Sequence, residues 1–490
     1  MRVPPVHAVD ARREFSWQRC TYAFALILAL GLCYFLAQVP LQISDDVANM
    51  MGAEAQSVAD LVGSELRPGS TYFRPMLTLA LNATFETGRA TGHYFLAAKA
   101  VQLAQVLVLL LLFARLLRVE SRADFAAASV AIVAAIGMHT FFFTVHEVYP
   151  VNTFMTILLC CVGVLVVCDG APSAWRDLAA VALFAVALFT IETGILVWPI
   201  ALVGFAVGFR GVSIRGLGAM TVVLVGFVAL KFVVLSGELP GLDQRSASFG
   251  FRSYSPPELA AAFSDRRLVF YAANVVSSIV TVFAAEPRAG LWRFVRTIVN
   301  GELPTAAMLL NVTTSAASSV LILWFIRSRW QAWRQLTFER ADRFVLVFLA
   351  VAFVNACVSF PYTKDVIVSP AGLLFALALY PALQAALRRL EDEHRRGVAV
   401  SAALAVGLLS LGWTLRAAAL PSGLLRTAYE YQQEWVHIDD WLVDQELTHY
   451  TAPQRAIIEH LRREALSMEV PNQLVVGGWI SWAERLFDRP

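Results

Sequence analysis

Residues 94–117 read YFLAAKAVQLAQVLVLLLLFARLL, and only Lys99 and Arg115 carry charge in this apolar run. A helix of about 20 mostly apolar residues is long enough to cross the hydrocarbon core of a bilayer. Similar runs recur along the chain, in which 58% of the residues are hydrophobic and 16% are charged, against about 25% charged in ordinary soluble domains. The composition excludes a soluble globular enzyme and predicts an all-α polytopic membrane protein.

The apolar runs predict eleven membrane spans, whose boundaries are approximate. They are predicted at 20–38, 94–117, 125–145, 149–168, 178–191, 194–209, 216–235, 305–326, 342–360, 366–386 and 398–417. Residues 268–285 are apolar enough to be a twelfth, but counting them would move the arginine-rich loop after Phe325 to the other side of the membrane. We therefore predict an outer-surface or re-entrant helix there.

The basic residues indicate which side of the membrane each loop occupies. Lysine occurs only at Lys99, Lys231 and Lys364, so arginine supplies almost all of the positive charge. Inner loops of membrane proteins carry the excess of Lys and Arg. With residues 1–19 inside, the predicted inner loops hold most of the arginines that flank spans, namely Arg2, Arg12, Arg13, Arg19, Arg115, Arg118, Arg122, Arg176, Arg210, Arg215, Arg327, Arg329, Arg334, Arg340, Arg343, Arg388, Arg389, Arg395 and Arg396. This bias predicts a cytoplasmic N-terminus and an extracytoplasmic C-terminus.

This topology predicts an uneven molecule with its function on the outer face. A transmembrane domain over 20–417 would carry two large outer loops, 39–93 and 236–304, followed by an extracytoplasmic helical segment over 418–490. That segment is too polar to enter the membrane and is expected to pack as a lid, with helices near 424–447 and 453–468. The arginine- and alanine-rich usage suggests a bacterial inner membrane.

Two adjacent acids, Asp45 and Asp46, follow the first predicted span. An apolar stripe at helical spacing comes after them and suits a helix lying in the membrane interface: Met50, Met51, Val58, Leu61 and Val62. One reading is that Ser44 caps this helix and both aspartates complement its N-terminal dipole. The other reading is that one of them is catalytic, and this segment alone favours neither reading over the other.

Further ionisable and aromatic residues map to the same outer face: Tyr72, Arg74, His93, His146, Glu147, Glu192, Lys364 and Asp365. Ionisable residues at membrane depth are costly and are by default candidates for function. Taken singly, each is as well explained as a turn charge or a buried ion pair. Together they suit a reaction between a phosphate-linked donor in the bilayer and an acceptor from outside, because a carboxylate can take the acceptor's proton while Arg or Lys neutralises the departing phosphate.

In this order the residues resemble the GT-C membrane glycosyltransferases, particularly protein O-mannosyltransferases and bacterial polyprenyl-phosphate-sugar glycosyltransferases. The resemblance covers roughly the first 210 residues. It rests on the first-loop acids and on the later short motifs Tyr72-x-Arg74-Pro75, Gly92-His93-Tyr94, His146-Glu147 and Glu192-Thr193-Gly194. From 236 onward only the helix pattern and the Tyr362/Lys364 loop are similar. Ile191 stands where relatives commonly carry lysine, which leaves Lys99 and Lys231 as candidates to reach Glu192.

The resemblance implies transfer of a sugar, with inversion, from a polyprenyl-phosphate donor to an extracytoplasmic lipid, glycan or protein. It assigns the base role to Asp45, with Asp46 as the alternate, and the donor phosphate to Arg74 and Lys364. The residues that would bind or orient the substrates are Tyr72, His93, His146, Glu147 and Glu192. The sequence requires no cofactor, although Asp45, Asp46 and His146 are candidate ligands for a divalent metal.

Two other classes of membrane protein remain as alternatives. A transporter or lipid flippase also has about a dozen spans and intramembrane charges, but it usually shows repeat symmetry around a midplane site, and the halves of this chain do not resemble each other. A membrane acyltransferase would need a histidine base, for which His93 and His146 are candidates. Nucleic acid is not an expected partner, since the net charge is only +2.

Overall fold

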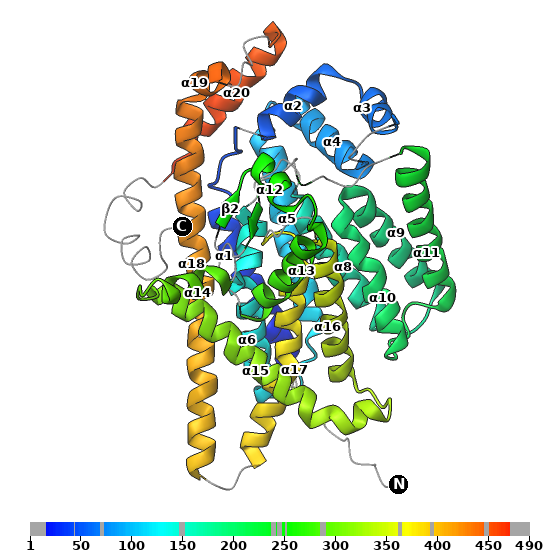
Figure 1. Cartoon of the computed structure of the whole chain (residues 1–490), viewed down its shortest axis with the longest axis vertical. Coiled ribbons are helices and arrows are strands. Elements are labelled where there is room, and N and C mark those ends of the chain that lie inside the picture. The colour runs from blue at the N-terminus through cyan, green and yellow to red at the C-terminus, as the bar shows by residue number, and fades with distance from the viewer. Residues whose placement is uncertain are drawn as a thin grey trace, which may run out of the picture.

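Helices build almost the whole molecule (Figure 1). The computed structural model describes residues 16–43, 45–68, 73–146, 152–236, 242, 247–249, 252–284, 291–360, 365–392, 396–444 and 450–470; the side chains of a few residues in these ranges, including Asp45, Asp46 and His146, are not described. The sheet within these ranges is a short hairpin of β1 (Ala247–Phe249) and β2 (Arg252–Tyr254). The prediction of an all-helical membrane domain is therefore confirmed in its helical content.

The helices follow the chain in this order: α1 (Trp17–Leu36), α2 (Asp45–Ala55), α3 (Val58–Glu65), α4 (Pro75–Thr91), α5 (Tyr94–Leu116), α6 (Arg122–Gly137), α7 (His139–His146), α8 (Thr153–Cys168), α9 (Ala174–Thr190), η1 (Glu192–Leu196), α10 (Val197–Ala206), α11 (Ile214–Val228), η2 (Ala229–Val234), α12 (Pro256–Phe263), α13 (Arg267–Phe283), α14 (Leu291–Val299), α15 (Ala306–Arg334), α16 (Arg340–Val358), α17 (Ser369–Asp392), α18 (Arg396–Val436), α19 (Ile438–Asp444) and α20 (Ala452–Ser467).

Seven of the described helices are long and apolar enough to cross a membrane: α1, α5, α11 with η2, α15, α16, α17 and α18. The number rises to nine if two bent pairs each count as one span, α6 with α7 at 58° and α12 with α13 at 115°. Each of the eleven predicted segments falls on helical structure, although the segment over 125–145 is broken into α6 and α7, α8 and the segment Glu192–Ala206 are short, and α9 has 17 residues. The chain is a helical polytopic membrane protein; the count of eleven spans stays a prediction.

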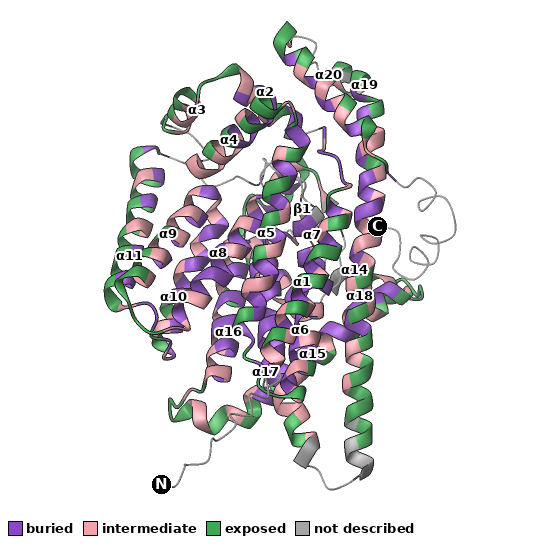
Figure 2. Ribbon diagram, turned by 180° about the vertical axis from the view of Figure 1, so that it is seen from behind, coloured by how far each residue is buried: buried purple, intermediate pink, exposed green. Residues whose placement is uncertain are grey.

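The core of the bundle surrounds α17. This helix packs on α6, α15 and α16, and most of its surface is buried, whereas α11 and the described residues of α18 before Gly412 are largely exposed (Figure 2). Helices α2, α3, α4, α19 and α20 gather at one end of the bundle, opposite the start of α1 (Figure 1). We call this the Glu192 end, and the opposite end the Asp169 end.

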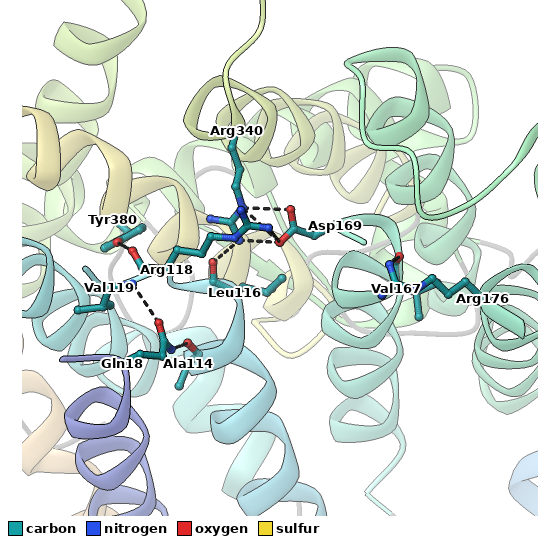
Figure 3. Close-up of polar contacts among 10 residues, drawn as sticks. All are labelled: Gln18, Ala114, Leu116, Arg118, Val119, Val167, Asp169, Arg176, Arg340 and Tyr380. Carbon is teal, nitrogen blue, oxygen red and sulfur yellow. Dashed lines mark hydrogen bonds and ion pairs between the residues drawn. The ribbon is translucent and has the colours of Figure 1, made fainter. Parts of the chain in front are cut away.

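Arginines join the helix ends at the Asp169 end (Figure 3). Arg340, the first residue of α16, donates from Nη2 to Asp169 Oδ2 at 2.7 Å and to the Leu116 carbonyl at 2.7 Å. Asp169 follows α8 and Leu116 ends α5, so one guanidinium connects three helices. Arg118 reaches the same carboxylate at 3.4 Å. Arg340, which the sequence used only as a marker of sidedness, therefore also satisfies a carbonyl group that the end of α5 leaves open.

Helix α18 corrects the predicted boundary near residue 417. A span over 398–417 and a separate helix near 424–447 were expected, but α18 continues from Arg396 to Val436 through Pro421. Proline removes one backbone hydrogen bond, and packing against neighbouring helices can offset that loss. Here α18 packs along α6 and buries Leu420, Leu424 and Ala428.

A buried arginine holds the break between α6 and α7. Phe141 N–H donates to the Met138 carbonyl, where a continuous helix would use the carbonyl of Gly137. Arg416 of α18, 5% exposed, supplies the missing donor from Nε at 3.0 Å. Its Nη1 donates to the Asn311 carbonyl and to the hydroxyls of Thr314 and Ser315, all on α15. Arg416 therefore joins α6, α15 and α18 through neutral acceptors.

We expect Arg416→Met to destabilise the protein by about 2–4 kcal/mol, because it leaves the Gly137 carbonyl and two buried hydroxyls without their donor. Thermal unfolding in detergent would show the loss as a lower midpoint. The matched control is Arg215→Met at the exposed start of α11. Equal midpoints for the two variants would contradict a structural role for Arg416.

Candidate active site

Three charged side chains from distant parts of the chain meet at the Glu192 end. Arg74 donates to Glu192 Oε2 from Nη2 at 2.7 Å and from Nε at 3.2 Å, and Lys231 Nζ donates to Glu192 Oε1 at 2.7 Å. The side chains are 24% exposed for Arg74, 33% for Glu192 and 6% for Lys231. We call this group the ionic triad.

The start of α4 fixes Arg74. Arg74 is the N-cap residue and Pro75 occupies the first helical position, where its fixed φ suits the helix and its missing N–H costs nothing. Glu65, the last residue of α3, accepts from the backbone N–H of Arg74 at 2.7 Å and from the hydroxyl of Thr78. A carboxylate at a helix N-terminus is stabilised by the helix dipole. Glu65 therefore links α3 to α4 and fixes the backbone from which Arg74 extends.

Glu192 begins η1, a 3-10 helix after α9 ends at Thr190. The turn depends on Gly194, because a Cβ at that position would lie 2.1 Å from the Ala187 carbonyl oxygen. Lys231 lies on the π-helix η2, a rare conformation that often marks functional sites. Its neighbours Phe232 and Val233 are exposed while Lys231 is buried, so the lysine faces the bundle from a helix whose other side suits lipid.

An aromatic layer accompanies the ionic triad. Phe73 lies 6.0 Å from Phe189 and 6.1 Å from Phe227 between ring centroids, and Phe189 lies 5.7 Å from Phe227. Each of the three segments that supplies a charge thus also supplies a ring, one to four residues earlier in the chain. Packed rings exclude water and lower the local dielectric constant, which strengthens the attraction between the charges.

The ionic triad has the chemistry of an anion-binding site next to lipid. It contains two cations and one carboxylate, so the three groups together carry one excess positive charge. Lysine has three N–H donors, and Lys231 uses one of them on Glu192 among the contacts described. The helix that carries Lys231 exposes a row of apolar side chains suited to a hydrocarbon chain: Val222, Val225, Val228, Val233 and Val234.

Among the residues singled out in the sequence, the structure brings together Arg74 and Glu192. Of the two lysines considered as partners for Glu192, it is Lys231 that makes the contact, whereas Lys99 lies within α5 and donates to Gln102 at 3.1 Å. His93, at the N-cap of α5, lies 3.6 Å from Glu464 of α20. Its predicted substrate role is untested by this placement.

Several predicted site residues cannot be placed with their side chains. Tyr72, Glu147 and Lys364 lie outside the described residues, as does Ser44, the predicted cap. Asp45 and Asp46 form the first turn of α2, and His146 ends α7, by their backbones alone. Within the described part of the chain, no three His, Cys, Asp or Glu side chains are grouped so as to hold a metal ion.

The structure also reveals a pair that sequence reasoning missed. His139 Nε2 lies 3.3 Å from Asp365 Oδ1, and both side chains are largely buried between α7 and the start of α17. Asp365 was noted only as a loop charge, and a single histidine in an apolar helix gives no signal of its partner. Glu65 was missed for the same reason, since its contact with α4 depends on how a loop folds back.

Comparisons with protein-family models, with curated proteins and with solved structures find no match for this chain. The case for a function therefore rests on the geometry of the Glu192 end and on the residues that surround it.

We expect Glu192→Gln to destabilise the protein by about 2–4 kcal/mol, because it leaves a buried lysine without its counter-charge. Adding Lys231→Met to Glu192→Gln should recover part of that loss, since it removes the unpaired charge. Thermal unfolding of the two single variants and the double variant measures this coupling. The control is Glu430→Gln, which breaks the exposed Arg426–Glu430 pair and should cost less than about 1 kcal/mol. Strictly additive effects at Glu192 and Lys231 would contradict the coupling.

Proposed function

We propose that this protein is an integral-membrane glycosyltransferase that moves a sugar from a polyprenyl-phosphate donor to an extracytoplasmic acceptor. The observation that carries the proposal is the ionic triad, whose excess positive charge lies at the end of an apolar bundle beside a lipid-exposed helix. A polyprenyl-phosphate sugar matches this arrangement, since its phosphodiester carries one negative charge and its long chain is apolar.

In this proposal Arg74 and Lys231 bind the donor phosphate. Arginine can hold two phosphate oxygens in a fixed geometry, and lysine contributes a mobile point charge. Lys364 is proposed as a further cation from the loop before α17. Glu192 keeps the two cations close together when no donor is bound. The negative charge on the phosphate grows as the sugar leaves, so these cations stabilise the transition state more than the bound donor.

The base of the reaction is proposed to be Asp45, with Asp46 as the alternate. Helix α2, which begins with these acids, packs on α4, and α4 begins directly after Arg74. The carboxylate takes the proton of the acceptor hydroxyl, and the hydroxyl oxygen bonds to the anomeric carbon as the bond from that carbon to the phosphate oxygen breaks. The electron pair leaves with the polyprenyl phosphate, and attack opposite the leaving group inverts the anomeric centre.

The remaining assignments belong to the same proposal. Tyr72, His93, His146 and Glu147 would contact sugar or acceptor, and a divalent metal beside Asp45 would assist the acid rather than replace it. The site would face the periplasm of a bacterial inner membrane, with the N-terminus in the cytoplasm.

A transporter or lipid flippase is the second candidate, and one observation favours it. Transporters use broken helices around a polar site within the membrane, and α6 and α7 break beside the buried His139–Asp365 pair. The ionic triad lies instead where α9 ends, close to the helix termini, which suits chemistry at the membrane surface better than alternating access.

Purified protein with radiolabelled polyprenyl-phosphate hexoses and pentoses, supplemented with membrane extract as a source of acceptor, tests the reaction directly. We expect sugar-dependent release of the lipid phosphate, and a loss of several orders of magnitude in Asp45→Asn, because the amide cannot take the proton. The same loss in Asp46→Asn instead would move the base role to Asp46. Near-normal turnover in both Asp45→Asn and Asp46→Asn would contradict the base assignment. If folded wild-type protein releases no lipid phosphate, the transporter is favoured instead.

Donor binding tests the cations separately from turnover. We expect Lys231→Met to weaken the affinity for a short-chain polyprenyl phosphate about 10- to 100-fold, because it removes the binding free energy of one charge-assisted hydrogen bond. Arg74→Ala should have an effect at least as large. Lys99→Met is the matched control, since it removes the other buried lysine that the structure describes. Equal affinities for the Lys231 and Lys99 variants would remove Lys231 from the donor site.

A further inference from the structure

Two residues from the C-terminal part of the chain bind backbone carbonyls before and after Asp45 and Asp46 in the sequence. Trp435, near the end of α18, donates from its indole Nε1 to the Leu41 carbonyl at 2.6 Å. Gln454, in the first turn of α20, donates from Nε2 to the Met51 carbonyl at 3.4 Å. The two acids therefore lie between two backbone carbonyls that are bound by residues about four hundred positions later in the chain.

These contacts answer a structural need. Residues 39–42 have no regular secondary structure, and Leu41 is buried, so its carbonyl requires a partner from elsewhere. Trp435, fully buried, supplies it while its ring packs 6.0 Å from Phe95 of α5. Glu434 Oε2 also accepts from the Ile43 N–H at 3.5 Å. The backbone of residues 41–43 is thus fixed by contacts with α18, because these residues form no regular secondary structure of their own.

Helix α20, which binds α2, is itself bound to the start of α5 and to α18. Glu464 accepts from the Phe95 N–H at 3.1 Å, which places a carboxylate at the N-terminus of α5, where the helix dipole favours it. His460 Nε2 lies 2.9 Å from the Gly92 carbonyl oxygen. On the other side, Gln432 of α18 donates to the Ala465 and Met468 carbonyls. The end of α18 and α20 form one bracket, with contacts to α2, α5 and the loop before α2.

We propose that Trp435 and Gln454 are positioning residues for the first-loop base: the bracket sets the backbone path of residues 41–43 and 45–51 and so fixes helix α2, which packs on α4. This inference rests on the proposed function, because it gives the bracket a role in transfer from the acids at 45 and 46. A displacement of about 1 Å in a catalytic group can cost about 100-fold in rate. Neither residue touches the substrates in this proposal, and donor binding at Arg74 and Lys231 does not depend on them.

Two conservative substitutions separate positioning from folding. Trp435→Phe keeps a buried ring and removes the indole N–H. Gln454→Glu keeps a side-chain oxygen that accepts from the Thr451 N–H in the capping box, but it replaces the N–H donor to the Met51 carbonyl with an acceptor. The matched control is Trp198→Phe, which removes a similar indole bond, to Thr221 Oγ1 at 3.0 Å, between α10 and α11.

We expect Trp435→Phe and Gln454→Glu to lower kcat about 10- to 100-fold while the affinity for short-chain polyprenyl phosphate stays within about twofold of wild type. Trp198→Phe should retain wild-type kcat. A spin label on Gly52→Cys reports the position of α2 independently of activity, since a side chain there meets open space. The label should gain mobility in both bracket variants and not in the control; a label on Gly63→Cys of α3, also in open space, should change little.

The outcomes distinguish this inference from the proposed function. Normal kcat in both bracket variants, with turnover still abolished by the Asp45→Asn/Asp46→Asn double variant, would overturn the bracket and leave the transferase standing. A loss of donor affinity equal to the loss of kcat would show general damage and would also overturn it. If the wild-type protein turns over no donor, the proposed function fails and the positioning role fails with it, whatever the Gly52 label reports.

Discussion

The structure depends on one constraint: a charge or a free backbone group inside an apolar bundle must have a partner, because no water is there to replace it. The buried Lys231 meets this constraint by binding Glu192, which also binds Arg74 and so joins α4, η1 and η2. Arg416 meets it differently, by taking the carbonyl that the α6–α7 break leaves open. In both cases a polar group that would be costly alone fixes the relative position of three segments. The polar residues therefore specify how the helices pack, while the apolar residues specify that they pack at all.

Much of the fold was predictable, because apolar runs of helical length give a strong local signal. Every predicted span falls on helical structure, although the one over 125–145 consists of two helices, α6 and α7. The errors arose where tertiary contacts override a local rule. A span over 398–417 and a separate helix near 424–447 were predicted, yet α18 is continuous through Pro421 and packs on α6. The break at Met138 was not predicted, because the segment over 125–145 is apolar along most of its length and Arg416, which binds the open Gly137 carbonyl, lies far away in sequence.

The candidate site was predictable only in part, for a related reason. Arg74 and Glu192 were singled out because both are charged residues expected at the outer ends of spans, and that argument needs only the order of the spans. Lys231 was one of two lysines with equal claims, since choosing between them requires knowing which helix packs beside η1. Glu65 and His139 carried no signal at all, because a carboxylate that caps another helix and a histidine that meets a distant aspartate look ordinary until the chain is folded.

The two ends of the bundle both place cations on carboxylates, and the difference between them is the reason for proposing a site at the Glu192 end. At the Asp169 end, Arg340 divides its donors between Asp169 and the last carbonyl of α5, so its hydrogen bonds are used to close helix ends. At the Glu192 end, the described hydrogen bond of Lys231 goes to the Glu192 carboxylate and to no helix-end carbonyl. Arg340 begins a helix that is packed deep in the bundle, whereas Lys231 lies on a helix exposed to lipid on its other side. The Asp169 end therefore uses its arginine to join helix ends, whereas the Glu192 end places its cations beside an exposed apolar helix face, which is why the proposal assigns the donor phosphate to the Glu192 end.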